Sequence, residues 1–412
     1  MASPTTSASE SMQQKQSTQQ SNKPKQPQHK HDRLITRDMA LVMLATFCFM
    51  SSNMLANPIV AGYAESLGAS GMLMGVVAGS MSFISLFCRP IAGNLSDRTS
   101  KRTLVAAGTV LYFADSPIML IMARVINGVG FACCSVCLAT WMSLLLPIRH
   151  MGAGMGLYGT MNALAMAVGP AFGIRTQKYI GYRLTFLSSP VLAAIMLIAA
   201  LMVKNGGQPV RKKQTSISAT KKHRFSIRSI LEPRVVPLSL TFMMFAIAYF
   251  ANQSFIVSYV QSRHLPVSSD LFFMFYAVAL LVLRLGLRDL FDSKGFRFWL
   301  TVCSLGMLAM LACMTFLFND WMLLLAAIFT AVGYGLMSSV TQAQAVVIAG
   351  RERSGIANST YYAGIDLGMS VGPFVGGLVY GHLPAVWFYP VFMLAMPVAW
   401  LIYLLCVKRV SR

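Results

Sequence analysis

The chain has 412 residues, of which 56% are hydrophobic and only 11% are Asp, Glu, Lys or Arg. Soluble globular domains carry roughly 25% charged residues, so this composition argues against a water-soluble enzyme. The charge is also one-sided, with 34 Lys and Arg against 13 Asp and Glu and a formal net charge of +21. Such an excess is typical of a nucleic-acid-binding protein, of a protein on an anionic membrane surface, or of a membrane protein whose basic loops lie on one side.

The N-terminal segment, residues 1–38, is expected to be a disordered tail. Its first 32 residues are mainly Gln, Ser, Thr, Lys and Pro, which offer almost nothing to bury. No apolar segment with a small-residue cleavage site follows Met1, so we expect no cleavable signal peptide.

Long apolar runs, broken by short Gly, Pro or charged connections, fill the chain from Met39 onward. A helix needs about 20 apolar residues to cross a bilayer, and backbone in lipid must satisfy its own hydrogen bonds, so the runs predict an all-α, polytopic membrane protein. Twelve transmembrane helices are expected, as two pseudo-symmetric six-helix bundles at 39–203 and 233–407. The expected spans are at about 39–66, 71–95, 103–114, 117–146, 151–174, 184–203, 234–261, 268–291, 296–318, 321–349, 354–380 and 385–407.

The positions of the Lys and Arg residues give the expected orientation. On this map, 26 of the 34 lie in the tail, in the loops on the tail's side, in a basic linker at 204–232, or in the last residues, 408–412. Cytoplasmic loops of multi-pass proteins carry this excess, so both termini are predicted to be cytoplasmic and the protein to lie in the cell membrane. The linker could be a nucleic-acid patch, but a flexible connection is the simpler interpretation, and we expect a lipid bilayer and no nucleic acid as partner.

The two halves resemble each other, which is typical of a duplicated transporter fold. The early matches are spaced by 195 residues and the later ones by 203 to 205, so the first half is about ten residues shorter between Asp97 and Gly128. The third span, residues 103–114, would be only about 18 Å long, against about 30 Å of hydrocarbon. We therefore expect an unusually short third helix. Either the segment around Asp115 and Pro117 is drawn into the membrane, or Lys101 and Arg102 snorkel and the bilayer thins locally, or the chain is damaged. The matching pairs are Asn57 with Asn252, Arg89 with Arg284, Gly128 with Gly333, and Gly169-Pro170 with Gly372-Pro373.

The sequence GNLSDRTSKR ends the second span and contains Gly93, Asp97, Arg98 and Arg102. It resembles the signature of the major facilitator superfamily between helices two and three, G-x-x-x-D-R-x-G-R-R, except that Ser100 replaces the second Gly. In the second half, Asp292 occupies the place that corresponds to Asp97. The resemblance implies a gating role, in which the carboxylate accepts hydrogen bonds in one conformation and releases them in the other.

The fourth span carries RVINGVG, with Arg124, Gly128 and Gly130, and resembles the fourth-helix motif of the same family. An Arg placed about 10 Å inside a helix end is costly in a membrane unless it faces a wet cavity or a partner. Arg124 is therefore a candidate substrate contact, with snorkelling to the surface as the alternative.

The fifth span contains AMAVGPAFG, with Gly169, Pro170 and Gly173, and the eleventh repeats it around Gly372 and Pro373. This sequence resembles the motif associated with antiporters of the family, which implies proton-coupled efflux of drugs or metabolites. Gly and Pro together kink a helix and let backbones pack closely. We expect a gating role, and ordinary small-residue packing is the alternative.

Asp366 lies about 18 Å along its helix from Ser354, near the expected midplane. An ionisable group at that depth is a functional hypothesis by default, and we expect Asp366 to couple transport to protons. The alternatives are that it pairs with an Arg across the two bundles or bonds to backbone.

Other polar residues on the first, seventh and tenth spans are candidate substrate contacts. Helices one and seven line the central cavity in this family, so the resemblance favours the repeat pair of Asn residues and their neighbours. Hydrogen bonding between helices is an equal alternative. The candidates are Asn57, Tyr249, Asn252, Gln253 and Gln342.

The sequence thus predicts a secondary active transporter that exports a small amphiphilic molecule in exchange for protons. Import of a sugar, amino acid or other metabolite, and a non-transporting or defective paralogue, remain open. The sequence contains no phosphate-binding loop, nucleophile motif or metal-ligand spacing, so we expect no enzyme activity, cofactor or metal. The expected partners are a small-molecule substrate and protons, and the expected state is a monomer.

Overall fold

The structure is a computed structural model that describes residues 36–98, 116–146, 151–204, 231–287, 290, 294–350 and 354–410. The chain divides into two units at the boundary between Thr36 and Arg37. Every helix below belongs to the second unit. The third expected span, 103–114, and most of the linker at 204–232 lie outside the described residues. The short third helix and the flexible linker therefore stay predictions.

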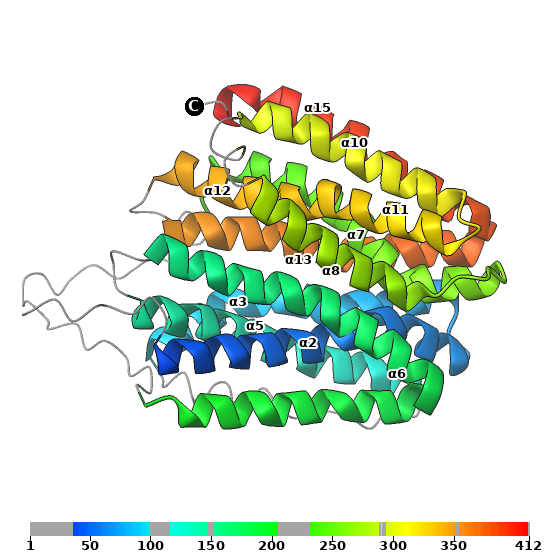
Figure 1. Ribbon diagram of the computed structural model, residues 1–412, viewed down its shortest axis with the longest axis horizontal. Coiled ribbons are helices and arrows are strands. Elements are labelled where there is room, and N and C mark those ends of the chain that lie inside the picture. The colour runs from blue at the N-terminus through cyan, green and yellow to red at the C-terminus, as the bar shows by residue number, and fades with distance from the viewer. Residues whose placement is uncertain are drawn as a thin grey trace, which may run out of the picture. The chain divides into compact units, whose positions relative to one another are not determined.

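The described part of the chain is helical and contains no strand (Figure 1). Nine of its helical stretches are long and apolar enough to cross a bilayer. The expected membrane spans that fall on described residues all lie on helices. The helices are α2 Arg37–Ser66, α3 Gly71–Arg98, α5 Pro117–Leu145, α6 Met151–Met202, α7 Val236–Ser262, α8 Ser269–Gly286, α10 Phe296–Thr315, α11 Asp320–Thr330, η3 Ala331–Leu336, α12 Met337–Ala349, α13 Ser354–His382, η5 Ala385–Trp387, α14 Phe388–Met393 and α15 Ala395–Val410.

Helix α6 carries both the fifth and the sixth expected spans. The sequence suggested a connection between about 174 and 184, but the backbone stays helical apart from Gly181, which has φ 77° and ψ 175°. Residues with a side chain rarely adopt a positive φ, whereas glycine does so readily. One residue therefore turns the chain between the two spans.

Two other spans are interrupted in ways that apolar length does not reveal. The tenth span consists of α11, the π-helical segment η3 and α12, which follow one another without a gap from Asp320 to Ala349. The last span consists of the 3-10 turn η5, then α14 and α15. Single π turns inside α-helices are often found at functional sites, and η3 contains Tyr334, which is described below.

Local capping explains where two helices begin. Ser116 precedes Pro117, and its side chain accepts a hydrogen bond from Met119 N at 3.2 Å. Asn319 accepts from Met322 N at 2.9 Å at the start of α11. Both side chains satisfy backbone N–H groups that have no partner within the first turn of a helix.

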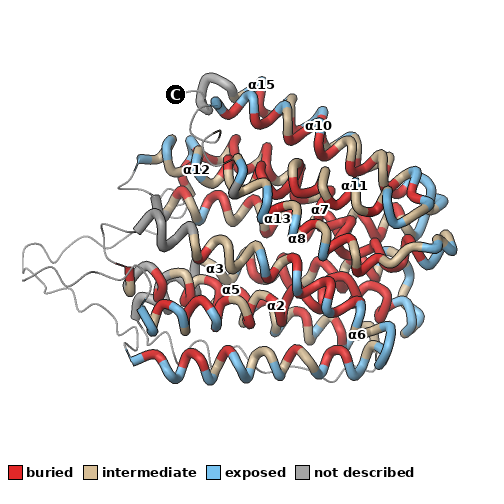
Figure 2. Tube along the Cα trace, viewed as in Figure 1, coloured by how far each residue is buried: buried red, intermediate tan, exposed pale blue. Residues whose placement is uncertain are grey.

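Helices α2, α7 and α13 are largely buried, whereas α6 and α15 present exposed apolar faces (Figure 2). Helix α2 packs on α6, α13 packs on both α7 and α3, and α3 packs on α5. Leu405 on α15 is 77% exposed and Val191 on α6 is 60% exposed. In a bilayer such side chains face lipid, so the exposed apolar surface agrees with a membrane location.

Candidate functional site

A buried ion pair joins α3 to α13. The Arg89 guanidinium donates from Nη2 to Asp366 Oδ1 at 3.0 Å and from Nε to Asp366 Oδ2. The Asp366 side chain is 1% exposed and the Arg89 side chain 17% exposed. Two N–H bonds to one carboxylate fix the geometry of the pair and offset part of the cost of removing both charges from water.

Residues of α5 and α13 enclose the guanidinium of Arg89. Its Nη1 donates to Ser135 Oγ at 3.4 Å. The guanidinium carbon lies 5.7 Å from the centroid of the Phe131 ring and 5.5 Å from that of the Tyr362 ring. Aromatic faces attract cations at these distances. The Arg89 charge on α3 therefore has partners on two other helices, α5 and α13.

The pair lies well inside the helices that carry it. Arg89 is about 27 Å from the start of α3 and Asp366 about 18 Å from the start of α13, at 1.5 Å per residue. Of the alternatives considered for Asp366, the structure contains the one in which the carboxylate meets an Arg. The sequence shows Arg89 only as the repeat mate of Arg284, and no local pattern connects residues that are 277 positions apart.

Arg124 is buried on α5 and contacts α2 and α3. Its Nη2 donates to Asn57 Oδ1 and to Ala78 O, both at 2.9 Å. Two of the candidate substrate contacts therefore meet directly. Arg124 also lines a small cavity, whose other lining residues are Ala56, Val60, Leu120, Ala123, Asn127 and Phe186.

The candidates in the second half do not join this group. Asn252 Oδ1 accepts from Tyr389 OH at 2.9 Å, so it bonds within its own half. Gln342 Nε2 donates to Asn358 Oδ1 at 3.3 Å. Gln253 is fully buried, and neither atom of its amide has a hydrogen-bond partner among the described residues. Asn57 and Asn252 match in the repeat but have different partners.

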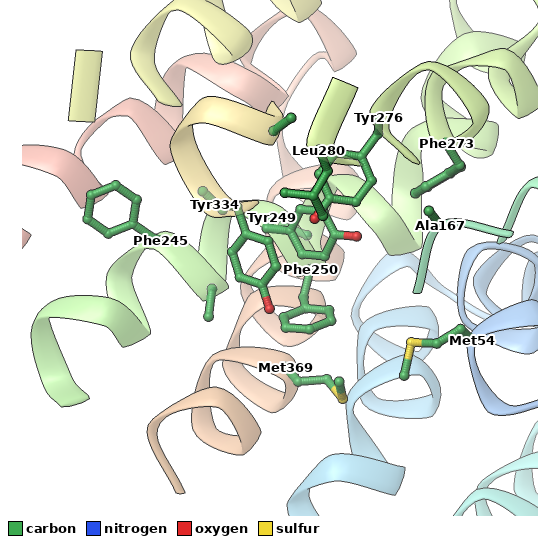
Figure 3. Close-up of a cluster of buried hydrophobic side chains, with 14 of the residues drawn as sticks. Met54, Ala167, Phe245, Tyr249, Phe250, Phe273, Tyr276, Leu280, Tyr334 and Met369 are labelled. Carbon is green, nitrogen blue, oxygen red and sulfur yellow. The ribbon is translucent and has the colours of Figure 1, made fainter. Parts of the chain in front are cut away.

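Buried aromatic rings pack against one another in the second half, and Tyr249, Tyr276 and Tyr334 are labelled among them in Figure 3. The rings of Tyr249 and Tyr334 stack with centroids 4.0 Å apart and planes 1° apart. Tyr276 lies 5.8 Å from Tyr249, and Phe242 stacks between Tyr334 and Tyr361 at 5.5 Å from each. These rings are buried against one another and form an apolar cluster apart from their hydroxyl groups.

The contact between α3 and α13 is close because glycines line it. A Cβ on Gly75 would lie 2.5 Å from Pro373 O and 3.1 Å from Gly377 Cα. A Cβ on Gly71 would lie 2.6 Å from Gly381 Cα. Small residues let helix backbones approach in membranes, so this part of the interface leaves no room for a side chain. We call the whole contact between α3 and α13 the first seam.

The contact between α6 and α8 also joins the two halves, and we call it the second seam. Lys178 Nζ lies 2.8 Å from Asp270 Oδ1, and Arg175 Nη1 lies 3.7 Å from Asp270 Oδ2. The Asp270 side chain is 6% exposed, whereas Lys178 is 42% exposed. Nothing in the sequence sets these residues apart, because charges near a helix end are typical of the loops that flank membrane spans.

The candidate gating residues fall into three groups. Gly128, Gly169, Gly173 and Gly372 lie at close approaches, with a Cβ on Gly169 2.9 Å from Ser51 O and a Cβ on Gly372 2.5 Å from Ile247 O. Pro170 and Pro373 lie inside α6 and α13, and Gly130 lies on α5. Gly93, Asp97 and Arg98 fall in the last turns of α3, where the structure does not describe side chains, and Arg102 and Asp292 lie outside the described residues.

The chain resembles known membrane transporters over most of its length. A sequence profile described as the Major Facilitator Superfamily matches residues 42–320 and 295–412. An uncharacterized MFS-type transporter of Methanocaldococcus jannaschii is 22% identical over 370 residues, which cover 85% of this chain and 92% of that protein. Multidrug resistance protein 2 of Bacillus subtilis is 19% identical over 338 residues, which cover 78% and 84%. The structure of the nucleoside transporter NupG has a TM-score of 0.69 at 12% identity, covering 92% of this chain and 100% of that one.

Proposed function

Because the chain belongs to the Major Facilitator Superfamily, whose members are transporters and not enzymes, we propose that it exports a small amphiphilic molecule in exchange for protons. The proposal includes twelve transmembrane helices in two six-helix bundles, a short third helix, both termini in the cytoplasm, and a monomer in the cell membrane. The bundles would alternate between two conformations, each of which opens the substrate site to one side.

The observation that carries the proposal is the Arg89–Asp366 pair. It is buried and bidentate, and it crosses from one half of the chain to the other. An ionised carboxylate at this depth is stable only while it is paired. Any movement that separates α3 from α13 at this point must therefore neutralise or re-pair both charges.

Protonation of Asp366 neutralises the carboxylate, while the Arg89 cation keeps its contacts with Ser135 and Phe131 on α5. The neutral acid no longer holds Arg89 by charge, so the first seam can open at this depth once a proton has bound. Loss of the proton restores the carboxylate and favours closure. A proton then shifts the balance between two conformations because it binds one of them more tightly than the other, which is what coupling requires.

The remaining contacts supply the other parts of the cycle. The glycine contact of the first seam and the Lys178–Asp270 pair of the second hold the halves together near the helix ends opposite the tail. Arg124 with Asn57 is the substrate contact we propose in the first half. The likeness to a multidrug resistance protein and the Gly169-Pro170 sequence favour export over import.

The proposal is tested with a panel of compounds on inverted membrane vesicles that contain the full chain. Dissipation of an imposed pH gradient on adding a compound is read for the natural chain, for Asp366→Asn and for Asp320→Asn. The last variant is the matched control, because Asp320 is an acid at a helix start that accepts a bond from Ser268 N at 3.1 Å. We expect compound-dependent proton movement in the natural chain and in Asp320→Asn but not in Asp366→Asn.

Two other results would replace the proposal. Compound movement without proton movement, equal in both directions in a counterflow assay, would assign a facilitator or an importer. No movement of any compound in a correctly inserted chain would assign a non-transporting paralogue.

A further inference from the structure

Each half of the chain contains the same set of an Arg, a Ser and a Tyr. Arg89 Nη1 donates to Ser135 Oγ at 3.4 Å, and Arg284 Nη2 donates to Ser339 Oγ at 3.0 Å. The two Arg residues are 195 positions apart and the two Ser residues 204 apart, which are the repeat spacings found above. Pseudo-symmetry therefore extends from the sequence to side-chain contacts.

The tyrosines complete the likeness. Tyr158 interacts electrostatically with Arg89, and Tyr361 interacts in the same way with Arg284. They are 203 positions apart, which is the spacing of the two Gly-Pro sequences. The two guanidinium groups thus share a Ser and a Tyr at corresponding positions of the two halves.

The two sets differ in what the opposite half provides. Arg89 is paired with Asp366, but the position 203 residues before Asp366 is Ala163. Arg284 Nε is buried without a hydrogen-bond partner, and its guanidinium makes no ion pair with any residue that the structure describes. Among the residues that the structure describes, the second cation therefore has the Ser and Tyr contacts of the first but no carboxylate.

The second seam brings Ala163 and Arg284 to the same depth. Helices α6 and α8 pack against each other, and the first part of α6 is antiparallel to α8 (Figure 1), so both extend to the same side of the Lys178–Asp270 contact. Arg284 lies about 21 Å along α8 from Asp270, and Ala163 lies about 22 Å along α6 from Lys178, at 1.5 Å per residue. Asp270 and Arg284 are also within about 40° of the same face of α8, since 14 residues are close to four turns.

We propose that Arg284 binds the anionic group, a carboxylate or phosphate, of the transported molecule in the second seam, at the place where Ala163 leaves the carboxylate missing. A cation in an apolar, aromatic surrounding is costly without an anion, and a ligand that brings one relieves that cost. The stacked rings of Tyr361, Phe242 and Tyr334 make the surroundings of Arg284 apolar, which favours a ligand that also has an apolar part. This inference rests on the proposed function, and it names the substrate class as organic anions with an apolar body.

A ligand-free measurement tests the missing carboxylate. The full chain in detergent is unfolded by heat, and Ala163→Asp is compared with Ala163→Asn, which has the same size without the charge. We expect Ala163→Asp to unfold at a higher temperature than Ala163→Asn, and the difference to vanish when Arg284→Gln is added to both. If the difference is absent, or survives the loss of Arg284, the proposal is overturned.

A binding measurement tests the ligand class. The probes are benzoate, phenyl phosphate, neutral benzamide and the anionic lipid phosphatidylglycerol, and the readout is ligand-dependent thermal stabilisation of the full chain. We expect benzoate or phenyl phosphate to stabilise the natural chain at concentrations at which benzamide does not. Arg284→Gln and Ala163→Asp should each weaken that binding about tenfold or more, while Arg284→Lys retains part of it.

The other outcomes are equally clear. Equal stabilisation by benzamide and benzoate, no effect of any soluble probe, or an effect of phosphatidylglycerol alone overturns the proposal. Because binding is read without transport, loss of proton coupling in vesicles with intact anion binding would reject the proposed function alone. Gradient-driven transport that depends on Asp366 but shows no anion preference would reject this inference alone.

Discussion

Removing either partner of the Arg89–Asp366 pair should destabilise the protein far more than removing both. Two unit charges about 4 Å apart interact by about 4 kcal/mol at an effective dielectric constant of 20. Breaking a buried pair typically costs about 3–5 kcal/mol, because the remaining charge stays buried. Asp366 is 1% exposed and Arg89 17% exposed, so neither charge reaches water by a change of rotamer alone.

The variants are Arg89→Leu, Asp366→Leu and the double substitution, and the assay is a denaturant titration of the full chain in detergent. We expect each single substitution to lower the free energy of unfolding by about 3–5 kcal/mol. The double variant should lie close to the natural chain, because replacing a buried pair by apolar side chains is often nearly neutral. The coupling energy is then about 3 kcal/mol or more. Additive losses in the double variant would refute the argument that the two charges stabilise each other.

Three further predictions concern the glycine contact of the first seam, the ion pair of the second seam, and Arg124. Gly75→Ala should lower the free energy of unfolding by about 1–3 kcal/mol, because its Cβ would meet backbone at 2.5 Å. Gly159→Ala, whose Cβ would have nothing within 4 Å, should be neutral or stabilising. Equal effects of the two variants in a denaturant titration would contradict the close packing of the first seam. Asp270→Asn should lower the free energy of unfolding by only about 1 kcal/mol or less in the same titration, since its partner Lys178 is 42% exposed. A loss as large as that of Asp366→Leu would contradict a weak, solvent-screened pair. Arg124→Lys should raise the KM of the transported compound about tenfold. The reason is that one guanidinium nitrogen donates both to Asn57 Oδ1 and to a backbone carbonyl, and both bonds are lost. An unchanged KM in vesicle transport would remove Arg124 from the substrate site.

The helical membrane fold could be predicted because lipid imposes a length and a composition on each span. A run such as 37–66 is long and apolar enough on its own, and no distant contact is needed to recognise it. Interruptions inside spans were harder to foresee. The turn at Gly181 depends on a single positive φ, and the π segment 331–336 depends on how α10 and α8 pack around it, so neither leaves a mark in the hydropathy.

The ion pair could be predicted only in part. Asp366 was recognisable because a carboxylate at that depth needs a reason to be there. Its partner was not, since Arg89 lies 277 residues earlier and looks like the boundary arginines that flank many spans. The repeat spacing between Arg89 and Arg284 was the available signal, and it becomes informative once Ser135 and Ser339 are seen to bond to them.

In the proposed cycle, the charge on Asp366 couples transport to protons. Comparing gradient-driven transport with counterflow tests this coupling most directly. Proteoliposomes with the natural chain or Asp366→Asn are assayed for uphill movement of the compound found in the vesicle panel, driven by a pH gradient, and for its counterflow without a gradient. We expect Asp366→Asn to lose gradient-driven movement and to keep counterflow, because exchange of substrate does not require a proton to leave residue 366. Gradient-driven movement of equal size in both proteins would contradict it.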